Sequence, residues 1–491
     1  MSRIRRASAW TAAVALGAWS LTGAATPASA AGATGTTAGT SLNHVRTVIG
    51  ADTGAAASLT GKGVGVALID TGVAPVSGLP AAQIVNGPDL SLESQSSDLR
   101  YLDTYGHGTH MAGIIVGNDT ATGTKGLAPG VKLTSIKVGT ATGAVDVSQV
   151  IAAVDWVVEH RDDDPANPIR VINLSYGSGG APKTWKDPLG FAVEKAWEAG
   201  IVVVAAAGND GNAAGTLANP ASDDWILTVG ATDTRGTAST ADDQLTTFTN
   251  LGNGGKQINV LAPGVSILSL RDPGSYIDTV FPTARTGSTL FRGSGTSQAT
   301  AVTSAAVALL LQAKPSATPD QIKDWIVKGS TRVPNGTAAN LGLQEINVNG
   351  ALARSGTVLP QVWTKSLGTG TLDSSRGDSR LMMDSSPLTG QRSVWGPFNP
   401  VTWAPRSKLG TSWAGGEWMG FRLTGDGWAG TSWAGRTWAS ATWANTAPWT
   451  AKASWSDPAW TGRRWTGRSW TAGTWSSRAW SSDDWASASW N

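Results

Sequence analysis

The chain of 491 residues contains no cysteine and only four histidines. Disulfides and thiolate metal sites are therefore excluded, and stability outside a cell would have to come from packing. Charged residues make up only 15% of the chain, and 37 basic residues nearly balance 35 acidic ones to leave a net charge of +2. Such a balance gives no strong field for nucleic acid or anionic lipid, so no nucleic-acid partner is expected.

The first thirty residues have the pattern of a secretory signal. Three arginines, Arg3, Arg5 and Arg6, precede a mostly apolar run, and Ala28-Ser29-Ala30 fits the small-residue rule for cleavage. A retained membrane anchor would need about 20 apolar residues, whereas polar residues interrupt this run. We therefore predict a signal peptide over 1–30 and a secreted or extracellular mature protein.

Short apolar runs alternate with helical patterns from Gly63 to about Ala353, within a predicted domain of residues 31–354. This alternation is typical of a buried parallel sheet with helices on both faces. We predict an α/β three-layer sandwich with a mostly parallel central sheet. The expected strands are Val64–Ile69, Val131–Val138, Ile169–Leu174, Ile201–Ala206, Trp225–Val229 and Ile258–Leu261, and helices are expected at Ser148–His160, Leu189–Ala199, Gln298–Ala313 and from Pro319 to just before Gly329.

The composition changes after this domain. Residues 355–394 are rich in Gly, Ser, Thr and Pro and are predicted to form a linker. Residues 395–491 form a low-complexity tail with 17 tryptophans among 97 residues, spaced by five from Trp455 to Trp490. This interval fits neither the two-residue repeat of a strand nor the 3.6-residue repeat of a helix. A disordered extension, attachment to cell-wall polysaccharide, self-association and membrane contact all remain open.

Three short motifs place an acid, an imidazole and a hydroxyl along the chain. Asp70 follows an apolar strand, His107 opens a helical run, and Ser297 stands at the head of another helix. A serine hydroxyl is a poor nucleophile at neutral pH, so it needs a base beside it, a group that orients the base, and donors for the developing oxyanion. The order Asp, His, Ser differs from the orders in chymotrypsin and in α/β-hydrolases.

With these motifs in this order, the chain resembles the subtilisin-like serine peptidases over about Val45–Ala353. The resemblance implies a subtilisin-like fold in which Asp70 orients His107, His107 takes the proton of Ser297, and Asn209 donates to the oxyanion. It also implies that an extended peptide binds as an added strand. The substrate-binding residues that it implies are Ser175, Tyr176, Gly177, Ala205, Ala206, Ala207 and Gly208.

Each motif also has a simpler interpretation. Asp-Thr-Gly is a common strand-to-turn sequence that also occurs in aspartic peptidases, and Gly-Thr-Ser before a helix is often only a cap. His107 and His110 lack the glutamate of the zincin arrangement, so we predict no catalytic metal and expect His110 to be packed in a helix. The joint occurrence of the motifs in family order favours catalysis.

The chain departs from the family in two places. Many members have proline four residues after the nucleophile, where this chain has Ala301, so the aim of the Ser297 hydroxyl is less constrained. Residues 118–123 occupy the place of a family calcium loop but contain one carboxylate, Asp119, whereas tight calcium sites use six to eight oxygens and several charges. A structural calcium ion and a solvated turn are both open for this loop, and no cofactor is expected for the chemistry.

The sequence thus predicts a secreted serine endopeptidase that acts on protein or peptide substrates through an acyl-enzyme. The alternative is a catalytically silent cell-surface protein that binds through its Trp-rich tail; cell-wall polysaccharide is one of the partners left open for this tail.

Overall fold

The computed structural model describes residues 39–94, 99–179, 185–252, 255–377, 379–383, 386–414 and 417–422, together with the backbone of 465–467. The predicted signal peptide lies outside the described residues. No helix within these ranges is long and apolar enough to cross a membrane.

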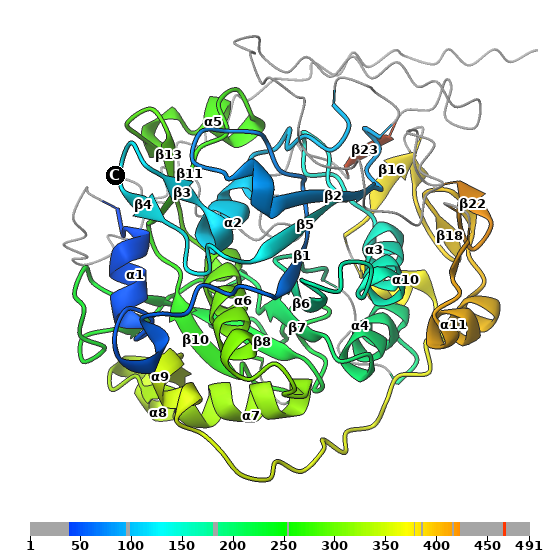
Figure 1. Ribbon diagram of the computed structural model, residues 1–491. Coiled ribbons are helices and arrows are strands. Elements are labelled where there is room, and N and C mark those ends of the chain that lie inside the picture. The colour runs from blue at the N-terminus through cyan, green and yellow to red at the C-terminus, as the bar shows by residue number, and fades with distance from the viewer. Residues whose placement is uncertain are drawn as a thin grey trace, which may run out of the picture. The chain divides into compact units, whose positions relative to one another are not determined.

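A mostly parallel sheet forms the centre of the fold (Figure 1). Its strand order is β14-β15-β10-β8-β7-β6-β1-β5-β2, with β9 paired to β8, and β14–β15 and β8–β9 are the antiparallel pairs within it. The strands are β1 (Gly65–Asp70), β2 (Ile84–Asp89), β5 (Lys132–Lys137), β6 (Ile169–Leu174), β7 (Val202–Ala206), β8 (Leu227–Asp233), β9 (Gln244–Leu245), β10 (Val260–Pro263), β14 (Thr331–Arg332) and β15 (Gln344–Glu345).

The structure confirms the six predicted strands as β1, β5, β6, β7, β8 and β10. They could be predicted because buried parallel strands appear in a sequence as continuous apolar runs. Strand β1, for example, is buried at all six positions. Strand β2 was not predicted, because its Asn86-Gly87-Pro88 has the composition of a turn. The carboxyl ends of β1, β6 and β7 meet at one edge, where open α/β sheets bind ligands.

Helices flank this sheet, which confirms the predicted α/β fold class. Helix α2 packs on α6, and α3 packs on α4. Their bounds are α1 (Leu42–Val48), α2 (His107–Val116), α3 (Val147–His160), α4 (Pro188–Glu198), α5 (Tyr276–Val280), α6 (Thr296–Ala313), α7 (Pro319–Gly329), α8 (Gly336–Leu341), α9 (Val348–Leu352), α10 (Leu372–Arg376) and α11 (Pro400–Leu409), and the 3-10 turns are η1 (Gly54–Ala56), η2 (Ala81–Gln83) and η3 (Pro282–Ala284).

Local capping explains where α3 and α7 begin. Asp146 and Gln149 form a capping box at α3, and Thr318 and Gln321 form another at α7, where Pro319 occupies the first turn. Helix α6 is buried at every position from Thr296 to Leu311, on its polar as well as its apolar sides. A helix enclosed in this way is a central core element rather than a surface helix.

Smaller sheets lie around the central one. They contain β3 (Asn118–Asp119) and β4 (Thr124–Lys125); β11 (Ile267–Leu270), β13 (Leu290–Gly293) and β12 (Arg285–Thr286); β17 (Ser386–Pro387), β16 (Leu381–Met383) and β23 (Trp465–Gly467); β18 (Arg392–Ser393) and β19 (Gly396–Pro397); and β20 (Trp413–Ala414), β21 (Glu417–Trp418) and β22 (Phe421–Arg422).

The structure differs from the prediction of a linker over 355–394 followed by a separate tail. Residues 354–371 form an extended connector without helix or strand, but Ser375 and Arg376 of α10 are fully buried. Trp403 and Trp418 are fully buried as well and belong to the main core cluster. Polar contacts with α3 and α4 hold this region, and such long-range partners cannot be read from its composition.

One of the five-residue tryptophan intervals has a structural explanation. Trp413 and Trp418 are register partners of the antiparallel strands β20 and β21. The interval here spans a hairpin and not one face of a strand or helix. Trp455–Trp490 lie outside the described residues, apart from the backbone of 465–467.

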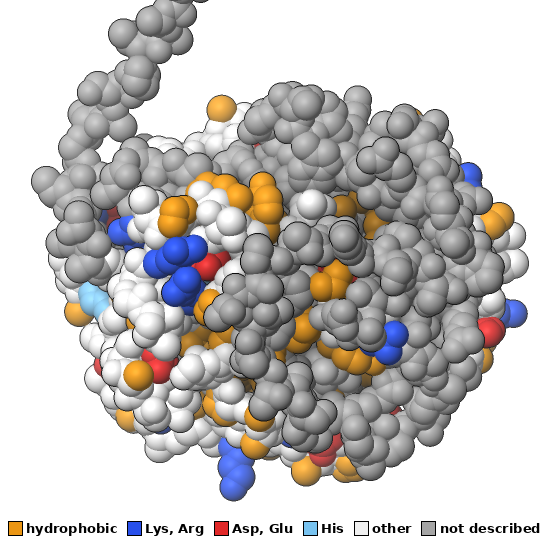
Figure 2. Space-filling view, turned by 90° about the horizontal axis from the view of Figure 1, so that it is seen from above, with side chains coloured by type: hydrophobic (Ala, Val, Ile, Leu, Met, Phe, Trp, Pro, Cys, Tyr) orange, Lys and Arg blue, Asp and Glu red, His pale blue; other side chains and the backbone are white. Residues whose placement is uncertain are grey.

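Figure 2 shows one face of the molecule, seen from above relative to Figure 1. On the coloured part of this face, Lys and Arg side chains form small groups, and acidic side chains lie close to some of them. The described part of this face therefore presents no broad basic field of the kind that binds a phosphate backbone. The absence of a nucleic-acid partner stays a prediction.

Candidate active site

Asp70 at the end of β1 and His107 at the start of α2 meet in the interior. His107 Nδ1 lies 2.8 Å from Asp70 Oδ1, and both side chains are buried. The same carboxylate oxygen accepts the N–H of Thr71 at 2.8 Å. A carboxylate at Nδ1 favours the tautomer that carries its proton there, which leaves Nε2 to act as a base.

Glycine allows the start of α2 to approach the turn after β1. A Cβ at Gly108 would lie 2.0 Å from the carbonyl oxygen of Gly72, which no larger residue tolerates. The N–H of Gly108 donates to Thr71 Oγ1 at 2.9 Å. The Asp-Thr-Gly and His-Gly-Thr motifs therefore interlock through small residues and one hydroxyl.

Two buried charged residues that the sequence analysis missed support this junction. Asp103 accepts the N–H groups of Gly106 and Thr109, both at 2.7 Å, and the hydroxyl of Thr71 at 2.7 Å. Burial raises the pKa of Asp103. Lys137 Nζ donates to the carbonyl of Thr71 at 3.0 Å and lies beside Glu93. The sequence signal for Asp103 is its place four residues before His107. An acid at the start of a helix can accept the first backbone N–H groups, as Asp103 does at α2.

Ser297 is the second residue of α6 and lies beside the end of β6. Its Oγ is 3.4 Å from the carbonyl oxygen of Ser175, and Ser175 Oγ donates to the carbonyl of Ser297 at 3.1 Å. Asn173 Nδ2 in turn donates to Ser175 Oγ at 3.0 Å. The bond from Ser175 Oγ holds the backbone carbonyl of Ser297 in place. This contact bears on the aim of the Ser297 hydroxyl, which was expected to be less constrained because Ala301 replaces the proline common in the family it resembles.

Asn209 lies after β7 and contacts the start of the same helix. Its Oδ1 accepts the N–H of Thr296 at 3.0 Å and the hydroxyl of Thr296 at 2.9 Å. These bonds fix the amide plane of Asn209 next to the residue that precedes Ser297. The structure thus brings Asp70 next to His107, and it brings Ser175 and Asn209 to the start of α6, which carries Ser297. Helix α2, which carries His107, packs on α6.

His110 is packed inside α2. Its Nε2 is 3.1 Å from the carbonyl oxygen of Phe291, and the side chain is fully buried. Burial, reinforced by the nearby His107, lowers the pKa of His110 to about 3. It stays neutral at ordinary pH and acts as a core residue, as the sequence suggested.

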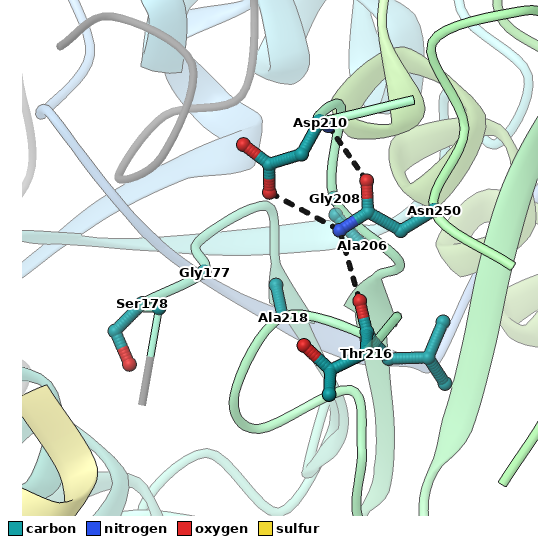
Figure 3. Close-up of a pocket in the computed structure, with 10 residues that line it drawn as sticks. Gly177, Ser178, Ala206, Gly208, Asp210, Thr216, Ala218 and Asn250 are labelled. Atoms are coloured by element: carbon teal, nitrogen blue, oxygen red, sulfur yellow. Dashed lines mark hydrogen bonds between the residues drawn. The ribbon is translucent and has the colours of Figure 1, made fainter. Parts of the chain in front are cut away.

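A pocket opens beside Asn209 (Figure 3). One wall is formed by Gly177, Ser178 and Gly179 after β6, and the other by Ala206, Gly208 and Asp210 at the end of β7. Thr216, Leu217, Ala218 and Asn250 complete the lining. Asn250 makes two hydrogen bonds with Asp210: its Nδ2 donates to the carboxylate at 3.2 Å, and its Oδ1 accepts the N–H of Asp210 at 2.6 Å.

The predicted substrate-binding residues take different positions around this pocket. Gly177, Ala206 and Gly208 line it. Ala205 is fully buried and lies between Leu174 and Thr228 of the neighbouring strands. The N–H of Ala207 donates to the backbone carbonyl of Val229. Ser175 contacts Ser297, as described above. Tyr176 is buried, and burial raises its pKa.

The loop over residues 118–123, for which calcium and a solvated turn were both open, folds as the hairpin β3–β4. Asp119 accepts the N–H of Ala121 at 3.1 Å and the hydroxyls of Thr122 and Thr289, both at 2.6 Å. Protein donors thus hydrogen-bond both of its carboxylate oxygens. A structural calcium ion and a solvated turn both stay open for this loop. Within the described ranges, no group of three or more His, Cys, Asp or Glu side chains has the arrangement of a metal site.

The sequence profile of the subtilase family matches residues 61–352. Serine protease AprX of Bacillus subtilis (strain 168) is 38% identical over 282 residues, which cover 56% of this chain and 63% of AprX. Minor extracellular protease Epr of the same strain is 33% identical over 55% of this chain and 36% of its own length. The chain therefore spans less than two thirds of either protein.

Two further similarities cover most of the matched protein. Subtilisin DY of Bacillus licheniformis is 31% identical over 307 residues, which cover 62% of this chain and 96% of that protein. A crystal structure of a cold adapted subtilisin-like serine proteinase is 28% identical, with 59% of this chain and 90% of that chain covered and a TM-score of 0.45.

Proposed function

The chain belongs to the subtilase family, and from this membership we propose that it is a secreted serine endopeptidase acting on protein or peptide substrates. Ser297 is the nucleophile, His107 the general acid and base, Asp70 the group that orients His107, and Asn209 a donor to the oxyanion. The observation that carries this proposal is the buried 2.8 Å contact between His107 Nδ1 and Asp70 Oδ1.

The first half of the reaction forms an acyl-enzyme. Ser297 Oγ attacks the peptide carbonyl while His107 Nε2 takes its proton, and Asp70 stabilises the imidazolium that results. The tetrahedral oxyanion is stabilised by the N–H groups at the start of α6 and by the amide of Asn209. His107 then gives its proton to the leaving amine, and water hydrolyses the ester by the same steps in reverse roles. This chemistry needs no cofactor.

The pocket supports binding of the substrate residue that precedes the cleaved bond. Its walls begin at Gly177 and Gly208, next to the segments that contact Ser297 and carry Asn209. An extended peptide lying along residues 175–177 would place alternate side chains toward this pocket.

Labelling with an organofluorophosphonate tests the proposal, because the reaction requires an activated hydroxyl. We expect mass spectrometry of the labelled protein to find the adduct on Ser297, and both Ser297→Ala and heat-denatured protein to remain unlabelled. Hydrolysis of a chromogenic peptide should fall about 10⁶-fold in Ser297→Ala. A folded wild-type protein that is neither labelled nor active would instead favour the silent surface-binding protein.

An extracellular location and a cell-wall role for the tail are the remaining parts of the proposal. The similarity to Minor extracellular protease Epr supports export. Tryptophan faces stack well on sugars, and 13 of the 17 tail tryptophans follow residue 422. Retention of the full chain, but not of a version ending at residue 422, on purified cell wall is the expected result.

A further inference from the structure

We propose that the C-terminal region, the described residues after 354, positions the pocket wall formed by Gly177, Ser178 and Gly179. The residues that do so are above all Ser375 and Ser379. Both residues lie beyond the part of the chain that matches the subtilase family, residues 61–352. They act as positioning residues, because they contact the wall and not the substrate. This inference rests on the proposed function, since it assigns a determinant of peptide selectivity to the same site.

The backbone of Ser375 in α10 connects two loops that line the pocket. Its carbonyl oxygen accepts the hydroxyl of Ser178 at 2.5 Å and the side-chain amide of Asn219 at 3.4 Å. Ser178 and Asn219 also exchange two backbone hydrogen bonds of 2.9 Å each. Ser178 lines the pocket directly, and Asn219 follows Ala218, which lines it from another loop. One oxygen of α10 therefore holds both loops together.

The side chain of Ser375 connects the same loops to helix α4. Its hydroxyl donates to Asp187 Oδ1, and Asn219 Nδ2 donates to the other oxygen of that carboxylate at 3.0 Å. Asp187 caps α4 by accepting the N–H of Gly190 at 3.1 Å. Ser375 and Asp187 are both buried, so these bonds are shielded from water. The position of Asn219 thus depends on a serine from the C-terminal region.

Ser379 makes a second contact with the wall. Its hydroxyl accepts the N–H of Gly179 at 3.3 Å, one residue beyond Ser178. In Figure 3, the yellow ribbon of this region of the chain is drawn below Ser178, on the side of Gly177 and Ser178 away from Asp210. Two consecutive wall residues are therefore braced from outside the matched domain.

An ion pair keeps α10 in place. Arg376 is fully buried, and its Nε and Nη2 contact the two oxygens of Asp146 at 2.5 and 3.1 Å. Asp146 is the N-cap of α3, and Arg376 Nη1 also donates to the carbonyl of Gly390 at 3.1 Å. A bidentate pair has both a fixed distance and a fixed orientation. Helix α10 is thus anchored to α3 and also bonded to the pocket wall.

These contacts predict an effect on selectivity and not on the nucleophile. The braced wall would accommodate the side chain that precedes the cleaved bond, while His107 and Asp70 are held by a separate set of bonds. Loosening the wall should raise KM and lower kcat most for peptides with a large residue at that position, because small displacements disturb the bound geometry.

The test compares Ser375→Ala with a matched control, Ser407→Ala. Ser375→Ala removes a buried hydroxyl that donates to the buried Asp187. Ser407→Ala removes a buried hydroxyl that donates to the buried Asp155 at 2.6 Å. Ser407 bonds to the middle of α3 and not to the pocket. Full-length variants are titrated with an organofluorophosphonate, and kcat and KM are measured on chromogenic peptides that differ only in Ala, Leu, Phe or Lys before the cleaved bond.

We expect Ser375→Ala to bind the probe fully but to lower kcat/KM about 10-fold for Leu and Phe relative to Ala, whereas Ser407→Ala keeps the wild-type ranking. Ser379→Ala, at a half-buried position that tolerates substitution, is measured in parallel and should shift the ranking in the same direction. Unchanged rankings in both pocket variants, with full labelling, would overturn this inference alone. A wild-type protein that the probe does not label would overturn the proposed function as well.

Discussion

Asp155 offers a direct measure of how strongly the C-terminal region is held. It lies on α3, is 3% exposed, and accepts three hydrogen bonds from residues about 250 positions later. Trp403 Nε1 and Trp418 Nε1 donate to Oδ2 at 2.7 and 2.8 Å, and Ser407 Oγ donates to Oδ1 at 2.6 Å. One buried carboxylate therefore joins three separate points of the C-terminal region to the catalytic domain.

The substitution Asp155→Ala would leave two indole N–H groups and one hydroxyl without an acceptor. Each orphaned buried donor costs about 1–3 kcal/mol. Part of this cost is recovered, because burial raises the pKa of Asp155 and thus disfavours its charge in the folded protein. The hydroxyl of Ser407 can also rotate toward another acceptor. We expect a net loss of about 3 kcal/mol in the free energy of unfolding, against about 1 kcal/mol for Ser407→Ala.

Two measurements follow the effect. Urea unfolding gives the free energy, and amide hydrogen exchange read by mass spectrometry locates it. Exchange should accelerate in peptides covering 400–418 while those covering α6 stay protected, because the lost contacts lie at the C-terminal region. If Asp155→Ala proves no less stable than Ser407→Ala, or if exchange over 400–418 is unaltered, the carboxylate does not anchor this region and the reasoning is wrong.

Three further predictions concern catalysis, pH and metal. Asn209→Ala should lower kcat about 10²–10³-fold with little change in KM, as expected for a donor to the oxyanion, and a loss confined to KM would argue against that role. Burial raises the pKa of Glu159 to about 7, so the folded protein keeps a proton that the unfolded chain releases near pH 4.5. Stability should therefore fall as pH rises from about 4.5 to 7, and Glu159→Gln should reduce this fall by about 2 kcal/mol in unfolding measured at pH 5 and pH 8. A pH dependence identical to wild type would contradict that assignment. EDTA should leave Tm unchanged because both carboxylate oxygens of Asp119 already accept hydrogen bonds from protein donors, and a fall of several degrees that calcium reverses would show that calcium binds the protein.

The sequence by itself predicted the sheet and the local setting of the candidate catalytic residues. Buried parallel strands are continuous apolar runs, and helix caps use a few residue types at fixed offsets, so both can be read within a dozen residues. Asp70 at a strand end, and His107 and Ser297 at helix starts, belong to this class of local signal. Their order along the chain then pointed to the family.

Only the tertiary structure decided the state of the region after residue 354. Its strands are two or three residues long, and its Gly, Ser and Thr content resembles that of a linker. Arg376 finds its partner Asp146 across 230 residues, and Trp403 finds Asp155 across 248. Polar pairing over such separations leaves no period in the sequence, because either partner taken alone looks like an ordinary surface residue. The fold brings them together, and burial turns them into the bonds that hold the C-terminal region against the pocket.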